Sequence, residues 1–344
     1  MYLRRMLILT AVIAAASCTN VDDYYLSNAS DPEVRELYRL VAQEDDPQVR
    51  AVAMERLAGF LLIESGPQPL IAYLTTYVER NPKDKYGGLY LYIVARSYLE
   101  TGAPTLARYY FERMVHGYSD VMNGTLSLRR AALEQLVELS GDPEERVIYY
   151  RMLLDEYGDE VDRGLLSYRL AENQAKLGDW DAVYATYRHI LRYPGLNVPG
   201  DPTAYRRIRE RVDFYDSRRN WLLPTVEDLR RTITWALANK DTATLARYQA
   251  GVNFFTRSWE QDFDDPNTTP NWNIGGILRL TRSLTIDRQV QMSADGNEAY
   301  LWTYGWGGLR IRTWYLYFRR VHFPPDPEIH GTWEWAGVYL GERL

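Results

Sequence analysis

The chain has 344 residues, of which 46% are hydrophobic and 25% charged, and its formal net charge is −6. This mildly acidic balance argues against nucleic-acid binding. The length and apolar content can supply a sizeable core and suggest two domains. The only cysteine, Cys18, leaves no intrachain disulfide, so the fold must be held by burial.

The first 17 residues predict an export signal. Arg4 and Arg5 precede an apolar run from Met6 to Ala16, which is too short to span a bilayer as a mature helix. The predicted cleavage removes residues 1–17, and residues 18–30 then form a tether.

The end of this signal, Ala15-Ala16-Ser17-Cys18, resembles the lipobox of bacterial lipoproteins, although Ala15 stands where leucine is commonest. The resemblance implies that Cys18 becomes the new N-terminus and carries acyl chains such as palmitate, which hold the chain at a lipid bilayer. The alternative is a soluble exported protein cut at an Ala-x-Ala-like site. In the lipoprotein case the tether reaches at most about 40 Å.

A repeat follows the tether. Gly66, Gly102, Gly141 and Gly178 are spaced by 36, 39 and 37 residues, and apolar stretches of helical period flank each one. This pattern predicts paired helices with glycine turns over residues 31–223, preceded by a helix from Pro32 to Glu44. The last part of this region, from Ala204 to about Trp221, is expected to be a capping helix with balanced charges.

The clearest copy of the repeat has Ala95 and Tyr98 before Gly102, then Ala107 and Phe111 after it. Four such copies in register resemble the tetratricopeptide repeat (TPR). The alternative is an irregular α-solenoid outside that family. Either array presents a concave surface that holds a partner protein, and such arrays rarely catalyse reactions.

The TPR resemblance also implies which side chains of the first helix in each pair line the groove. For each of them the alternative is an ordinary solvated helix residue. These candidate partner-binding residues are Arg56, Phe60, Glu64, Tyr92, Arg96, Glu100, Gln135, Glu138, Tyr168, Glu172 and Lys176.

Residues 224–344 predict a smaller α+β domain. Thr225 is expected to cap a helix that runs to about Ala238, and a second helix runs from Thr242 to about Gln249. Alternating residues rich in Thr, Tyr and Trp then predict a curved antiparallel meander with a hairpin turn at Asp295-Gly296. The expected strands are Leu278–Met292, as one long strand or a bent pair, then Glu298–Tyr304, Leu309–His322 and Gly331–Gly341.

This order of elements, together with the segment Ala236–Asp241, is similar to the nuclear-transport-factor-like cone fold, which implies a pocket inside a bent sheet. The alternative is another α+β domain. Trp302, Trp306, Trp314 and Trp333 form a possible ligand or partner surface there, unless they simply pack in the core.

Catalytic and cofactor motifs are absent from the sequence: it has no Walker loop, dinucleotide-binding glycine motif, zinc-protease motif or nucleophile elbow. We therefore expect no enzyme activity, no cofactor and no metal. His322 and His330 are the only closely spaced histidines and lack a further ligand of useful spacing. Asp262, Asp264 and Asp265 lack the spacing of a calcium loop and are expected to be solvated.

Together these features predict an α+β multidomain lipoprotein of the bacterial cell envelope, with a TPR-like solenoid that binds other envelope proteins as a scaffold. The combination resembles the lipoprotein subunit of the outer-membrane β-barrel assembly machine, and the periplasmic face of the outer membrane is the favoured location. A ligand-binding or enzymatic cone domain with the repeats as adaptor is the first alternative. A surface-exposed adhesin is the second.

Overall fold

The computed structural model describes residues 25–26, 29–261, 274–307 and 310–343. Contacts divide the chain into two compact units, Met1–Leu177 and Gly178–Leu344. The predicted α+β class is confirmed: helices in sequential pairs come first, and a six-stranded sheet follows. Cys18 and the acidic residues Asp262, Asp264 and Asp265 lie outside the described residues.

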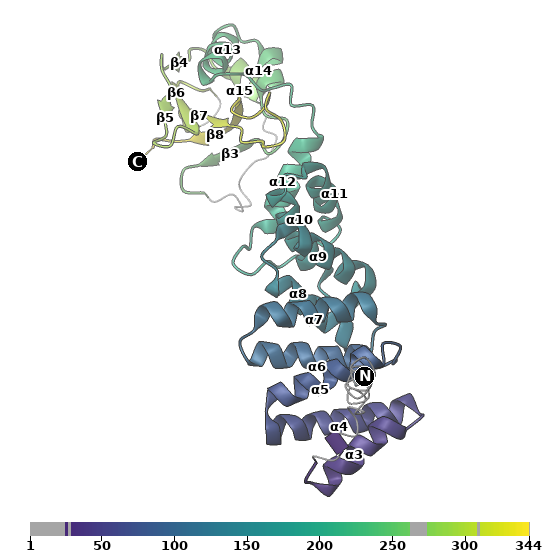
Figure 1. The fold of residues 1–344 in the computed structure, drawn as a ribbon. Coiled ribbons are helices and arrows are strands. Elements are labelled where there is room, and N and C mark those ends of the chain that lie inside the picture. Colours follow the sequence, from purple (N-terminus) through teal and green to yellow (C-terminus); the bar gives the residue numbers. More distant parts are fainter. Residues whose placement is uncertain (1–24, 27–28, 262–273, 308–309, 344) are drawn as a thin grey trace, which may run out of the picture. The chain divides into compact units, whose positions relative to one another are not determined.

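The first unit is a stack of helices in which each packs on the next along the chain (Figure 1). Gly66, Gly102 and Gly141 each lie between two consecutive helices, and Gly178 follows the last helix of the unit, as the repeat predicted. The helices are α3 Pro32–Gln43, α4 Pro47–Ser65, α5 Pro67–Arg80, α6 Gly87–Glu100, α7 Pro104–Gly117, α8 Leu128–Leu139, α9 Pro143–Tyr157 and α10 Arg163–Lys176.

Local sequence explains where these helices begin and end. Asp31, Asp46 and Asp142 cap the starts of α3, α4 and α9, and a proline follows each at the first helical position. Gly66 and Gly102 adopt φ values of 82° and 73°, a conformation that favours glycine.

The prediction made from the helical repeat missed one element of the first unit. A short hairpin, β1 Met122–Asn123 and β2 Leu126–Ser127, lies between α7 and α8. Its turn contains Gly124 with φ 61°, and Asn-Gly is a strong hairpin signal that the helical periodicity obscured. The expectation of helices throughout this region was therefore wrong at the hairpin.

The second unit combines five helices with a mixed sheet. The sheet order is β3-β8-β7-β6-β4, and β5 also pairs with β6. The helices are α11 Trp180–Ile190, α12 Ala204–Asp216, α13 Val226–Ala238, α14 Thr242–Tyr248 and α15 Ile274–Leu280. The strands are β3 Phe255–Ser258, β4 Thr285–Ile286, β5 Gln291–Met292, β6 Glu298–Tyr304, β7 Thr313–Arg320 and β8 Trp333–Leu340.

Two of the predicted strands need correction. The single long strand expected over Leu278–Met292 is wrong, because its first residues end α15, whose Ile274 and Leu278 are buried four residues apart on one helix face. Only β4 and β5 remain of that strand. The strand predicted over Leu309–His322 is shorter, as β7, and β3 adds a parallel partner to β8 that the meander did not include.

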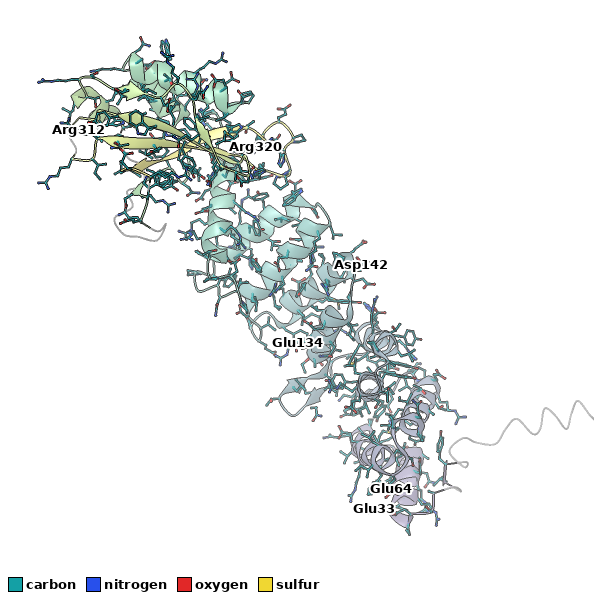
Figure 2. All side chains as sticks on the ribbon, turned by 90° about the vertical axis from the view of Figure 1, so that its left-hand side faces the viewer. Glu33, Glu64, Glu134, Asp142, Arg312 and Arg320 are labelled. Carbon is teal, nitrogen blue, oxygen red and sulfur yellow. The ribbon has the colours of Figure 1, made fainter. Side chains whose placement is uncertain are left out.

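Both faces of the sheet are covered with apolar side chains. Trp314, Leu316 and Phe318 of β7 join a core formed with α13 and α15, while Tyr315 and Tyr317 join an aromatic cluster on the other face. All five side chains are therefore buried, although they alternate in direction along the strand. Arg312 and Arg320 mark the two ends of this strand in Figure 2.

No helix within the described ranges has the length and hydropathy needed to cross a membrane.

Candidate partner-binding groove between α3 and α5

Two hollows lie along α3, α4 and α5 of the first unit, with volumes of about 460 Å³ and 330 Å³. We call the larger one the basic hollow and the smaller one the acidic hollow, and together they form the α3–α5 groove. The basic hollow is lined by Val41, Ala42, Arg50, Tyr73, Thr76, Tyr77, Arg80, Asn81, Pro82, Lys83 and Asp84. The acidic hollow is lined by Tyr25, Ala29, Ser30, Asp31, Val34, Tyr38, Phe60, Leu61, Glu64, Ser65 and Pro69.

The two hollows occupy opposite ends of the same helices. The basic hollow takes residues from the ends of α3 and α5 and from the start of α4, whereas the acidic hollow takes the beginning of α3 and α5 and the end of α4. Figure 2 shows Glu64 and Glu33 together at the acidic end. The two hollows therefore lie at opposite ends of α5, which is about 20 Å long.

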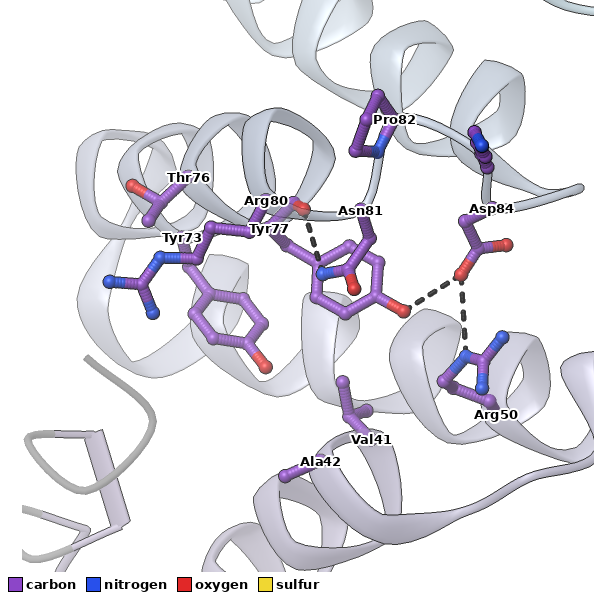
Figure 3. Close-up of a pocket in the computed structure, with 11 residues that line it drawn as sticks. Val41, Ala42, Arg50, Tyr73, Thr76, Tyr77, Arg80, Asn81, Pro82 and Asp84 are labelled. Atoms are coloured by element: carbon purple, nitrogen blue, oxygen red, sulfur yellow. Dashed lines mark hydrogen bonds and ion pairs between the residues drawn. The ribbon is translucent and has the colours of Figure 1, made fainter. Parts of the chain in front are cut away.

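A buried carboxylate holds the loop that closes the basic hollow (Figure 3). Asp84 is only 2% exposed, and its Oδ2 atom accepts hydrogen bonds from the Tyr77 hydroxyl at 2.7 Å and from Arg50 Nε at 3.3 Å. Its Oδ1 atom accepts a hydrogen bond from the backbone N–H of Tyr86 at 2.8 Å. The carboxylate therefore joins the start of α4, the end of α5 and the start of α6.

The pKa directions in this network agree with the geometry. Burial raises the pKa of the Tyr77 hydroxyl, and its hydrogen bond to the negative Asp84 raises it further. Burial alone would lower the pKa of Arg50, but the neighbouring Tyr77 and Asp84 outweigh it and raise the pKa. At neutral pH this leaves a charged Arg50 guanidinium beside a neutral tyrosine.

Two further cations make the basic hollow positively charged. Arg80 and Lys83 are exposed and have no ion pair or hydrogen bond from the side chain to any residue that the structure describes. Arg50 is already neutralised by Asp84, so Arg80 and Lys83 remain to attract an anionic group. The hollow can accept acidic side chains of a partner.

Three tyrosine rings separate the hollows. The ring centroid of Tyr25 lies 5.6 Å from that of Tyr38 and 4.9 Å from that of Tyr73, and Tyr38 and Tyr73 are 5.1 Å apart. Burial, followed by the neighbouring Tyr25, raises the pKa of Tyr38 to about 12. The chain segment at Tyr25 is thus seated on α3 and α5 before the array begins.

Only part of the groove predicted from the sequence coincides with these hollows. Phe60 and Glu64 line the acidic hollow, whereas the exposed Arg56 forms an ion pair with Glu33 at 2.5 Å. Two others are taken up by packing: Tyr92 has a ring contact with Phe111, and Tyr168 is buried. Neither hollow includes the remaining predicted residues: Arg96, Glu100, Glu138 and Lys176 are exposed, while Gln135 and Glu172 are half-buried. Their contact with a partner stays a prediction.

Sequence reasoning missed the residues of the basic hollow. Arg50, Tyr77 and Asp84 come from three different segments, so no single motif contains them. The signal that was available is the run Arg80-Asn81-Pro82-Lys83-Asp84-Lys85, in which charges gather in the turn after a helix.

The four tryptophans that the sequence suggested as a ligand or partner surface are mostly core residues. Trp306 and Trp314 are stacked with centroids 4.1 Å apart, and Trp306 Nε1 donates a hydrogen bond to Thr303 Oγ1 at 2.8 Å. Trp333 is buried as well, and Trp302 alone is half-buried. A ligand or partner contact is a prediction that now applies best to Trp302.

The histidine pair offers little as a metal site. The rings of His322 and His330 lie 5.6 Å apart, and His322 Nε2 is 2.9 Å from Asn297 Oδ1. In the part of the chain that the structure describes, no three His, Cys, Asp or Glu side chains are placed to hold one metal ion.

Compared with known proteins, the chain matches no protein-family model, and no curated protein is significantly similar to it.

Proposed function

We propose that this protein is a lipid-anchored scaffold of the bacterial cell envelope, which binds another envelope protein in the α3–α5 groove. The observation that carries the proposal is the groove itself. Two hollows open along a stack of paired helices, and one end carries Arg80 and Lys83, which form no ion pair with the residues that the structure describes. A TPR-like array is suited to this role, because it offers a long surface with little chemistry of its own.

The position of Tyr25 supports the anchored part of the proposal. Six residues lie between Cys18 and Tyr25, and the seven steps from one Cα to the next span at most about 25 Å when extended. Because Tyr25 packs against Tyr38 and Tyr73, an acylated Cys18 would hold the groove within that distance of the bilayer. The periplasmic face of the outer membrane is the proposed location.

The packing of the second unit favours the scaffold hypothesis and disfavours a ligand-binding cone domain. Trp306, Trp314 and Trp335 are each no more than 1% exposed and belong to the core between sheet and helices. These large side chains occupy the space where a cone-shaped fold would hold a small ligand. We propose that this unit also acts through its outer surface.

The test is crosslinking of the native lipoprotein in membranes, followed by purification and mass spectrometry. The variant Arg80→Glu/Lys83→Glu is expected to lose at least about tenfold of the main partner adduct, because it reverses two cations in the basic hollow. The variant Arg151→Glu/Lys176→Glu makes the same charge change on α9 and α10 and should keep the adduct. If only this second variant loses it, the partner binds at the sequence-predicted groove on α10 and not between α3 and α5.

Membrane attachment is tested in the same preparation. Cys18→Ala is expected to move the protein into the soluble fraction. A Cys18→Ala protein that stays membrane-bound would contradict the lipid anchor.

A further inference from the structure

Helix α4 is apolar on two sides. Its buried side contributes Met54, Leu57 and Leu61 to the core, as a helix of an array should. Its opposite side carries exposed aliphatic residues: Ile63 is 85% exposed, Val52 60%, Val49 46% and Leu62 39%. The exposed Gln48, Glu55 and Arg56 share this side, so it is a mixed surface whose aliphatic residues are not covered by any residue that the structure describes.

The exposed aliphatic residues lie on one side of the helix, where the exposed Glu55 and Arg56 fall between them. At 3.6 residues per turn, Val52, Gly59 and Ile63 fall within about 40° of one another around the helix, roughly opposite Leu57 and Leu61. Apart from the helix's own backbone, no heavy atom of the described residues lies within 4 Å of where a Cβ of Gly59 would be, so the middle of this face is open. We call Val49, Val52, Gly59, Leu62 and Ile63 the outer face of α4.

The tether is long enough to bring this face to a membrane. Tyr25 lines the acidic hollow together with Glu64 and Ser65, the residues that directly follow Leu62 and Ile63. From Tyr25 the chain runs back to Cys18 over at most about 25 Å. That distance is about twice the diameter of a helix, so an acylated Cys18 can bring the outer face of α4 onto the lipid.

We propose that the outer face of α4 is a membrane-contacting surface, which lies on the same bilayer that holds the acyl chains of Cys18. This inference rests on the proposed lipid anchor. The anchor supplies the local concentration of lipid, and the aliphatic side chains, each able to gain about 1.5 to 3 kcal/mol on full burial, supply the contact. Since the groove lies on the other side of α4, this contact leaves both hollows open to a partner.

The single native cysteine makes the proposal directly testable, because Cys18 is blocked by acylation and one introduced cysteine can be labelled alone. The lipidated full-length variants Val52→Cys, Ile63→Cys and Ile148→Cys are labelled with an environment-sensitive fluorophore and reconstituted into phosphatidylethanolamine/phosphatidylglycerol vesicles with nitroxide-labelled lipid. Ile148 is the matched control, since it is 49% exposed on α9.

The expected result is about a twofold or greater loss of emission for labels at positions 52 and 63 and little change at 148, as for side chains at the headgroup boundary. Adding Ile63→Asp should abolish the quenching at position 52. Equal quenching at all three positions, or none at 52 and 63 in protein that floats with the vesicles, overturns the membrane contact and leaves the anchor intact. If the label's emission instead changes with the number of protein molecules per vesicle and not with nitroxide lipid, the outer face of α4 binds a second copy of the protein. That result would also overturn the membrane contact. Loss of flotation would instead refute the anchor, and with it this inference.

Discussion

The two units bury their aromatic residues in different ways. In the helical unit, tyrosines such as Tyr38 and Tyr73 pack near the surface and border hollows between helices. In the sheet unit, tryptophans such as Trp314 and Trp335 lie inside, between β-strands and helices. The difference shows that an aromatic residue in the sequence does not by itself indicate a binding surface, because the neighbouring elements decide whether it is covered.

The largest expected effect concerns the sheet core. Trp314→Ala should lower the free energy of unfolding of the sheet unit by about 4 kcal/mol, because it removes a fully buried ring that stacks on Trp306. Trp302→Ala should cost about 1 kcal/mol or less, since its ring is only half-buried. Urea unfolding followed by near-ultraviolet circular dichroism measures both. An equal loss in the free energy of unfolding for both variants would contradict the assignment of Trp314 to the core and of Trp302 to the surface.

In the helical unit, the buried side chain expected to matter most for stability is the Asp84 carboxylate. Asp84→Ala should lower the free energy of unfolding by about 3 kcal/mol, because Arg50 and the Tyr77 hydroxyl lose their buried acceptor. Tyr77→Phe removes one hydrogen bond and should cost only about 1 kcal/mol. If chemical denaturation gives the same small change for both variants, Asp84 does not hold the loop between α5 and α6.

The packing of Tyr25 against α3 and α5 is expected to contribute less to the free energy of unfolding. Tyr25→Ala should cost about 1 kcal/mol, through the loss of ring contacts with Tyr38 and Tyr73. Tyr25→Phe keeps the ring and serves as the control. Limited proteolysis should cut Tyr25→Ala near residue 25 faster than the control, and equal cutting rates would argue against this packing.

The smallest effect is a pH dependence in the sheet unit. Asp295 in the β5–β6 hairpin turn has its pKa lowered to about 2, by hydrogen bonds first from the Ser293 hydroxyl and then from Asn297. A lowered pKa means that the turn is stabilised above the ordinary value of 3.8, and that this stabilisation is lost as the pH falls through about 2. An NMR titration should show the Gly296 amide shifting in that window, and Asp295→Asn should remove the shift.

The sequence predicted the helical unit better than the sheet unit. Glycines, prolines and capping aspartates fix the ends of helices locally, so Gly66 and Asp31 were informative without any knowledge of tertiary contacts. Strand β3 pairs with β8 across about 80 residues, and such a pairing leaves no local trace. The end of α15, from Leu278 to Leu280, was assigned to a strand, because a short apolar run fits either structure.

The groove was predictable only in part. Phe60 and Glu64 follow from the helical register of the repeat, and the structure places both in the acidic hollow. The basic hollow depends on how α3 and α5 flank α4, which periodicity alone does not determine. The same holds for the outer face of α4, whose exposure depends on which neighbours the helix has.

The most direct test of the partner-binding groove is site-specific photocrosslinking in intact cells. A photoreactive residue at Thr76, inside the basic hollow, is compared with one at Thr101, an exposed threonine at the end of α6. Both threonine hydroxyls donate a hydrogen bond to the carbonyl four residues earlier, so the substitutions are closely matched. We predict a discrete protein adduct at position 76 and none at 101. Adducts of equal yield at both positions, or none at 76 in membrane-bound protein, would contradict the groove as the partner site.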